Sequence, residues 1–334
     1  MPRVTVCIPT YDRPRWLGGA IESVLAQTYG DWVLEVHDDA TPGTVVRDIV
    51  DRYDDPRVVY VGHERNVGIV GNFNRSLLGA RTEFVVQVGD DDELRPEMLA
   101  LTVAALDRHP RAGVAHGRFD LIDAGGGLLR AAADWTGDGG NPPLEPGADF
   151  LAASMRYGCR ICSTTALIRR AAVPSGGFRE ADHPPFDLAF WLRMAHGWDV
   201  AFLPQALCRY RIHAESHSSG VAGMEQDGYV QRRAALETVH RVKLEAAAGD
   251  PRLLRAARRG HARDLLADAR TRTLPERRLR PTAAALAGAA REEPALALDP
   301  RAWGTLAASV LGRRVYGRLR RQPRVERSTP NASA

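Results

Sequence analysis

Residues 3–88 alternate short apolar runs with segments of helical periodicity. Four of the runs are rich in β-branched residues and too short for helices, so we expect strands at residues 3–9, 32–37, 58–61 and 84–88. An amphipathic helix is expected to begin at Pro14, and another to span residues 72–80 with Asn72 as its N-cap. Successive strand–helix–strand units pair their strands in parallel. The alternation therefore predicts an α/β fold, with a mostly parallel sheet flanked by helices.

Carboxylates follow two of the predicted strands. Asp38 and Asp39 come directly after residues 32–37, and Asp90, Asp91 and Asp92 follow the strand at 84–88. Ligands of open α/β sheets bind outside the carboxyl ends of the strands, so both groups are expected at a binding edge. Three adjacent carboxylates repel one another unless a cation neutralises them, and Mg²⁺ and Mn²⁺ prefer oxygen ligands. A solvated acidic turn is the other explanation of the triplet taken alone.

The order of these motifs resembles the N-terminal part of the family 2 glycosyltransferases, which have the GT-A fold. The segments that carry the resemblance are VTVCIPTYDR at 4–13, AIESVLAQTY at 20–29, Asp38 with Asp39, Asn66 with Gly68, Asn72, and GDDD at 89–92 followed by Pro96. The resemblance covers residues 3 to about 215. It implies a GT-A (Rossmann-like) sheet and a metal-dependent, inverting transfer of a hexosyl group from a nucleotide-diphosphate sugar to a hydroxyl acceptor. Such transfers serve cell-surface polysaccharide or glycoconjugate biosynthesis.

The resemblance also implies which residues contact the nucleotide. Asp39 matches an acid that accepts the N3–H of a pyrimidine base, and a carboxylate is a strong acceptor. A UDP- or dTDP-linked donor is therefore expected, although a GDP-sugar remains open. Asp38 or Asp39 could instead cap the turn that follows. The other residues matched to nucleotide contacts are Pro9, Thr10, Tyr11, Asp12, Asn66, Asn72 and Asp90.

For the cation, the resemblance points first to Asp91, with Asp92 and His213 as further candidate ligands of Mg²⁺ or Mn²⁺. The cation would stabilise the negative charge that builds on the departing nucleoside diphosphate. Gly89 departs from the family pattern, because many members carry their first acid there. Which of the three aspartates touch the metal therefore stays open. Two weaker candidates for phosphate contact are Arg211 and His217.

The candidate general base is Asp187. An inverting transfer needs a group that removes the proton of the acceptor hydroxyl as its oxygen attacks the sugar. Asp187 matches the family's base at the start of a helix, where the helix dipole favours an ionised carboxylate. An N-cap without catalysis is the alternative, since aspartate is favoured there anyway. Asp182 is the second candidate for the base.

Changes in composition and the positions of prolines divide the chain into a catalytic domain at 1–220, an Arg- and Ala-rich helical extension at 221–321 and a disordered tail at 322–334. The glycine-rich stretch at 124–147 is expected to be a mobile loop near the acceptor. No apolar stretch is long enough to cross a membrane and no signal segment is visible, so we expect a cytoplasmic enzyme. Cys159 and Cys162 have no second pair at zinc-ligand spacing, so free thiols are expected.

Residues 225–334 carry 23 basic against 12 acidic residues, whereas residues 1–224 carry 22 against 29. Within this basic part, residues 302–321 are expected to form an amphipathic helix with an arginine cluster at its end. Such a helix could lie on the inner face of an anionic membrane, or it could pack on the catalytic domain. A nucleic-acid partner is not expected, because aromatic residues are not interleaved with the basic ones.

Two other functions remain to be weighed. A nucleotidyltransferase on a related fold would normally carry a glycine-rich phosphate loop after the first strand, and residues 10–14 contain no glycine. A non-catalytic sugar-nucleotide binder or membrane-recruited partner protein would not need a full set of carboxylates. The set is present here, which favours the transferase.

Overall fold

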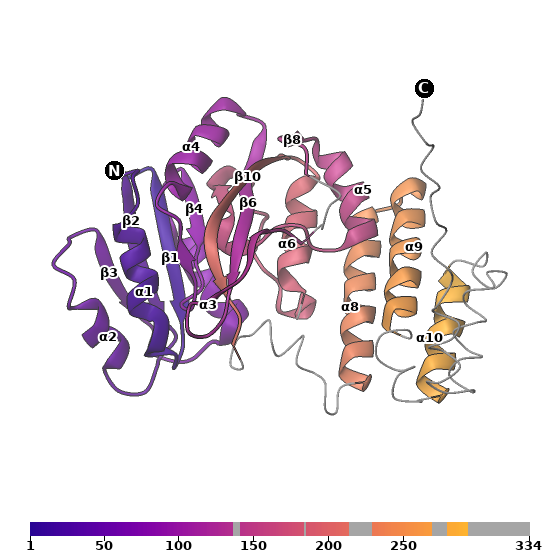
Figure 1. The fold of residues 1–334 in the computed structure, drawn as a ribbon. Helices are drawn as coiled ribbons and strands as arrows, with labels where there is room; N and C mark the ends of the chain where they lie inside the picture. The colour runs from indigo at the N-terminus through magenta and orange to yellow at the C-terminus, as the bar shows by residue number, and fades with distance from the viewer. Residues whose placement is uncertain (136–140, 184, 214–228, 269–278, 293–334) are drawn as a thin grey trace, which may run out of the picture. The chain divides into compact units, whose positions relative to one another are not determined.

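A computed structural model of the chain describes residues 1–135, 141–183, 185–213, 229–268 and 279–292 (Figure 1). The chain forms two compact units, Met1–Ala257 and Arg258–Ala334. The predicted boundary after residue 220 lies outside the described residues, as do the predicted helix at 302–321 and the tail at 322–334. Among the described helices, none is both long and apolar enough to cross a membrane.

The first unit is built on one sheet, to which ten described strands belong in the order β3-β2-β1-β4-β9-β6-β10-β5, with β7 beside β6 and β8 beside β10. β1 to β4 are parallel where they pair, β6 and β10 are also parallel, and β9 joins the two groups in antiparallel fashion. This mostly parallel sheet confirms the predicted α/β class. The strands are β1 (Val4–Thr10), β2 (Trp32–Asp38), β3 (Val58–Gly62), β4 (Phe84–Gln87), β5 (Glu93–Leu94), β6 (Ala112–Ile122), β7 (Leu128–Ala133), β8 (Leu144–Glu145), β9 (Leu167–Arg169) and β10 (Asp199–Arg211).

Helices cover both faces of the sheet because alternate strand residues point to opposite sides. On β1, Val6 and Ile8 pack into a core with residues of α1 and α4, whereas Cys7 lies in the other core with residues of α3 and α6. α8 packs against α6. The described helices are α1 (Pro14–Leu25), α2 (Val45–Val50), α3 (Gly68–Gly79), α4 (Met98–Arg108), α5 (Gly147–Tyr157), α6 (Phe186–Ala195), α8 (Tyr229–Ala247), α9 (Pro251–Asp268) and α10 (Leu279–Glu292).

The four predicted strands are β1 to β4, and α1 begins at Pro14 as predicted. The predicted start of the next helix is wrong: α3 begins at Gly68, so Asn72 lies inside the helix and is not its N-cap. The backbone N–H of Gly68 donates to the side chains of Asp39 and Asn66. These two side chains cap the N-terminus of α3, so the helix starts four residues before Asn72. The expected loop at 124–147 contains β7 and β8.

His116 in β6 links the sheet to a measurable pH dependence. Its buried ring packs on Phe202, with ring centroids 5.3 Å apart, and burial lowers its pKa from 6.5 to about 3. Between these pH values the unfolded chain binds a proton that the folded chain does not, so stability should fall as the pH is lowered through this window. His116→Gln should flatten this part of the curve of unfolding free energy against pH, measured by denaturant titration. An exposed position, His196→Gln, is the matched control, and an unchanged slope in His116→Gln would contradict the assignment.

Candidate active site

The acidic triplet follows β4 at the carboxyl edge of the sheet, beside the loop that follows β1. Thr10, the last residue of β1, donates its hydroxyl to Oδ2 of Asp90 at 2.7 Å. Arg13 donates to Oδ1 of the same carboxylate at 2.6 Å. Asp90 is buried, and burial raises its pKa to about 6 even though the Arg13 guanidinium opposes the shift. Asp90 thus ties the two loops together.

Asp91 is the member of the triplet that remains accessible, with 13% of its side chain exposed. Its Oδ2 lies 2.8 Å from Nε2 of His213 and 3.4 Å from a nitrogen of Arg13. Among the described residues, none donates a hydrogen bond to its Oδ1. The imidazole of His213 is held by Trp16 of α1, whose ring centroid lies 4.1 Å away. Asp91 and His213, 122 residues apart in the chain, therefore meet as predicted candidates.

Asp92 faces inward, and only 2% of the residue is exposed. Thr164 donates its hydroxyl to Oδ2 at 2.5 Å, and the backbone N–H of Arg211 donates to Oδ1 at 2.9 Å. Burial, reinforced by the neighbouring charge of Asp91, raises the pKa of Asp92 to about 8. Both oxygens are thus engaged within the protein. The prediction that Asp92 binds the cation stays a prediction, and Asp91 is better placed for that part.

Gly89, the departure from the family pattern, is explained by close approach. A Cβ at this position would lie 2.7 Å from Oδ1 of Asp91 and 2.9 Å from Oδ2 of Asp92. The two carboxylates therefore fold back over the glycine, and an acid at position 89 would push them apart.

Gly89→Ala is expected to leave the fold intact, because the atoms it meets are the movable ends of side chains. It should weaken binding of a cation and a nucleoside diphosphate by about 10-fold or more, since it displaces the Asp91 carboxylate. Calorimetric titration of both ligands would measure the change. Gly79→Ala, where a Cβ would meet nothing within 4 Å, is the matched control, and equal affinities in both variants would contradict the explanation.

The side chain of Arg211 holds the segments around the triplet together. It donates to the backbone carbonyls of Asp91 and Asp123 at 2.8 and 3.2 Å, and to the carboxylate of Glu93 at 2.6 Å. A guanidinium committed to three protein acceptors is better suited to fixing the triplet than to holding a phosphate. The sequence-based candidate His217 lies outside the described residues.

The first acidic pair anchors the other side of the site. Oδ1 of Asp38 accepts the backbone N–H of Thr41, and its Oδ2 accepts the hydroxyl of Tyr60. Asp39 accepts the backbone N–H groups of Val67 and Gly68 at 2.9 and 3.0 Å, and only 2% of it is exposed. Asp38 therefore caps the turn, as the alternative explanation of this pair proposed. Each oxygen of Asp39 can accept a second hydrogen bond, so contact with a base stays a prediction.

The other predicted nucleotide residues surround this pair. Tyr11 is exposed, and Asp12 adopts the left-handed region at φ 51°, where its backbone N–H donates to Thr41. Asn72 is buried and donates to the backbone carbonyl of His37 at 3.1 Å. Asn66 is exposed beside the start of α3. Tyr11 and Asn66 are thus accessible to a ligand, whereas Asn72 fixes α3 to the sheet.

Asp187 is the second residue of α6, within its first turn. The Cys159 thiol donates to its Oδ2 at 3.6 Å, and its own helix contributes the backbone N–H of Leu188 to Oδ1. Burial raises the pKa of Asp187 above the usual carboxyl range. Asp182, the other candidate, is buried and accepts a hydrogen bond from Arg241 of α8 at 3.2 Å. Asp187 has no ion-pair partner among the described residues, whereas Asp182 has one, so Asp187 is the better candidate for the base.

A short segment connects the predicted base to the acidic triplet. Cys159 contacts Asp187, and Thr164, five residues later, contacts Asp92. A five-residue segment spans at most about 17 Å when extended, so the two groups belong to one neighbourhood. Sequence reasoning missed Arg13, Thr164 and Cys159, since their contacts join segments that lie 28 to 77 residues apart. Arg13 stood in the matched motif, which was the one signal available.

Comparisons with known proteins identify the family to which the chain belongs. Residues 5–171 match the model of a family described as Glycosyl transferase family 2. WcaA of Escherichia coli (strain K12), named as a glycosyl transferase of colanic acid biosynthesis, is 31% identical over 31% of this chain and 37% of WcaA. EpsE of Bacillus subtilis (strain 168), named as a glycosyltransferase, is 32% identical over 64% of this chain and 74% of EpsE. The chain spans 16% and 37% of the lengths of the first two curated relatives that it matches.

The fold resembles that of S. aureus TarS residues 1–349, solved in complex with UDP-GlcNAc. The TM-score is 0.64 at 16% identity, and the match covers 92% of this chain and 88% of that one. The GT-A type of fold predicted from the sequence is thereby confirmed. Because the family model matches residues 5–171 and the alignment with EpsE covers 74% of that relative, this chain belongs to glycosyl transferase family 2.

Proposed function

We propose that this chain transfers a sugar, with inversion, from a nucleotide-diphosphate sugar to a hydroxyl acceptor. The observation that carries the proposal is Asp91, an accessible carboxylate paired with His213 at the carboxyl edge of the sheet. Asp90 and Asp92, on either side of it, are buried and fixed by Thr10 and Thr164. One carboxylate is thus presented to a ligand by two that hold the loop.

The donor set fits a divalent cation. Asp91 and His213 would hold it, and the imidazole nitrogen favours Mn²⁺ over Mg²⁺, which demands oxygen ligands. When bound, the cation supplies positive charge that stabilises the departing nucleoside diphosphate. When no cation is bound, Arg13, which lies against Asp90 and Asp91, partly neutralises their negative charge. Its guanidinium is also a hydrogen-bond donor for phosphate oxygens.

For the nucleotide, we propose a UDP- or dTDP-linked donor. Asp39 is the acceptor for the pyrimidine N3–H, since the two backbone donors that hold its carboxylate leave lone pairs on both oxygens. The exposed Tyr11 flanks the same edge. TarS, which has this fold, is solved with UDP-GlcNAc, and this supports the proposal.

Asp187 is proposed as the general base. Its first-turn position on α6 favours the ionised form, whereas burial favours the protonated form. The resulting balance brings its pKa nearer to neutrality, where a carboxylate is a stronger base. The Cys159 thiol donates to Oδ2 and steadies the side chain. The name of WcaA, which refers to colanic acid biosynthesis, supports a place in polysaccharide biosynthesis.

The test is release of nucleoside diphosphate from UDP-, dTDP- and GDP-sugars, each with Mn²⁺, Mg²⁺ or EDTA. We expect turnover with a pyrimidine-linked sugar that requires the cation, and a product whose anomeric configuration, read by NMR, is opposite to that of the donor. A purine-only response would overturn the base assignment. Retention of configuration would overturn the mechanism, and binding of a sugar nucleotide without turnover under any condition would favour the non-catalytic alternative.

A further inference from the structure

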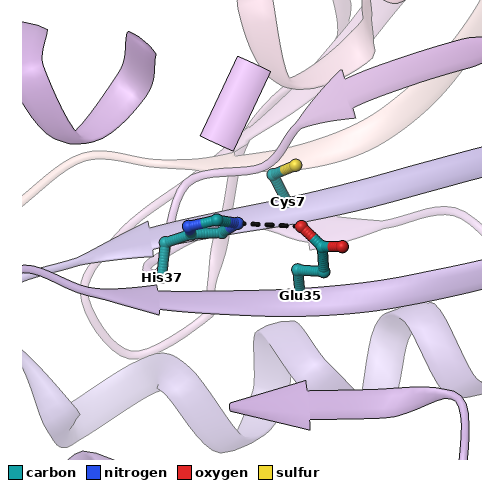
Figure 2. A group of neighbouring side chains, drawn as sticks. All are labelled: Cys7, Glu35 and His37. Atoms are coloured by element: carbon teal, nitrogen blue, oxygen red, sulfur yellow. Dashed lines mark hydrogen bonds and ion pairs between the residues drawn. The ribbon is translucent and has the colours of Figure 1, made fainter. Parts of the chain in front are cut away.

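A second group of metal-ligating side chains lies between the sheet and α3, apart from the acidic triplet. Cys7 comes from β1, and Glu35 and His37 come from β2 (Figure 2). Cys7 is the register partner of Glu35, and positions 35 and 37 share one face of their strand. One ligand atom from each residue lies within 4.8 Å of the others. Nε2 of His37 and an oxygen of Glu35 are 3.0 Å apart.

The surroundings of this cluster leave its ligand atoms available. Cys7 is fully buried, and its thiol donates one long hydrogen bond, 3.6 Å, to the carbonyl of Ser76 in α3. The ring of His37 is buried, and its Nδ1 has no partner among the described residues. Nδ1 is therefore free to take the ring proton when Nε2 binds an ion. The Glu35 side chain is 27% exposed, which gives the cluster an opening to solvent.

We propose that Cys7, Glu35 and His37 form a binding site for a divalent cation of the zinc type. Thiolate and imidazole ligands select Zn²⁺ or Co²⁺ over Mg²⁺, whereas the Asp91 site lacks sulfur. The thiol of Cys7 loses its proton to solvent and its sulfur binds the ion. The proton on Nε2 of His37 moves to Nδ1, so that Nε2 can bind. One thiolate, one carboxylate and one divalent ion leave the buried site electrically neutral.

The geometry requires only side-chain adjustment. Zinc binds sulfur at about 2.3 Å and nitrogen or oxygen at about 2.0–2.2 Å, so ligand atoms around one ion lie about 3–4 Å apart. The Glu35–His37 pair already has this spacing. Cys7 must approach by a side-chain rotation, and water can supply the fourth ligand through the exposed side of Glu35. The bound ion would join β1 and β2 a few residues before their last residues, Thr10 and Asp38, after which the two loops of the proposed nucleotide site begin.

Titration of the full chain with Co²⁺, after removal of metals by a chelator, tests the site. We expect one tight equivalent, a thiolate-to-cobalt charge-transfer band in the near ultraviolet and release of about one proton per ion bound. Cys7→Ser should abolish the band. Glu35→Gln and His37→Gln should weaken binding by at least about 10-fold. His196→Gln, at an exposed histidine, should bind as the wild type does.

Asp91→Asn separates this site from the one in the proposed function. It should keep the cobalt band, whatever happens to nucleotide binding. Loss of the band in Asp91→Asn, its absence from the wild type, or its persistence in a folded Cys7→Ser would each overturn the proposal. If Cys7→Ser does not fold, the decision falls to Glu35→Gln, whose side chain is partly exposed, and wild-type affinity in that variant would overturn the proposal.

Discussion

Asp91→Asn is expected to abolish the cation-dependent binding of nucleoside diphosphates and to lower sugar transfer by about 10³-fold or more. The amide keeps the size of the carboxylate but loses its charge, so it no longer attracts a divalent ion. A diphosphate would then meet the remaining acids of the triplet with only Arg13 to offset their charge. Thermal stabilisation by UDP, dTDP and GDP, each with Mn²⁺, Mg²⁺ or EDTA, measures the loss directly.

Asp92→Asn is the informative comparison, because it tests the neighbouring candidate ligand. As an amide, residue 92 can still accept from the backbone N–H of Arg211 and can donate to Thr164, so the loop should keep its shape. We expect most of the cation response to survive in this variant. Asp149→Asn, at an exposed position on α5, controls for the loss of one negative charge in Asp91→Asn. If Asp91→Asn keeps the wild-type response to the cation and Asp92→Asn loses it, Asp92 and not Asp91 is the metal ligand.

The fold was predictable because its signals are local. Strand length, β-branched composition and Pro14 at the first position of α1 act within a few residues of the elements they define. The start of α3 was missed for the opposite reason. Asp39, which holds the N–H of Gly68, lies 29 residues earlier in the chain, and no typical capping residue stands directly before the helix.

The candidate site shows the same division. The triplet, Asp187 and His213 stand in recognisable motifs, and their order in the chain led to the family. Their individual states depend on partners far away in sequence: Arg211 donates its backbone N–H to Asp92 across 119 residues, and Thr164 reaches the same carboxylate across 72. Sequence therefore named the acids, and only the packed structure distinguishes the accessible Asp91 from the buried Asp92.

The cluster of Cys7, Glu35 and His37 could be predicted from the sequence only in part. A search for cysteine pairs at zinc-ligand spacing finds no site, because the ligands here are of three residue types on two strands. Alternation places Glu35 and His37 on one face of β2, which a sequence can reveal. The pairing of Cys7 with Glu35 depends on the register of β1 against β2, which a sequence does not reveal.

Asp187→Asn is expected to separate chemistry from donor binding. Nucleotide binding should stay near the wild-type value, because the contacts of Asp187 run to Cys159 and to its own helix. Sugar transfer should fall by about 10²- to 10⁴-fold, the scale of a lost general base. Single-turnover rates with saturating donor would measure the chemical step. Asp182→Asn, which removes the charge that faces Arg241 in an ion pair, should lower stability instead of the rate.

The pH dependence supplies the sharper criterion. A general base must be ionised, and burial raises the pKa of Asp187, so the wild-type rate should fall as the pH drops through a value above the usual carboxyl range. Asp187→Asn should lose this limb of the profile, whereas a merely structural aspartate would leave the limb in place and lower the rate at every pH alike. If the limb persists in Asp187→Asn and disappears in Asp182→Asn, the proton of the acceptor passes to Asp182 and the assignment of the base is wrong.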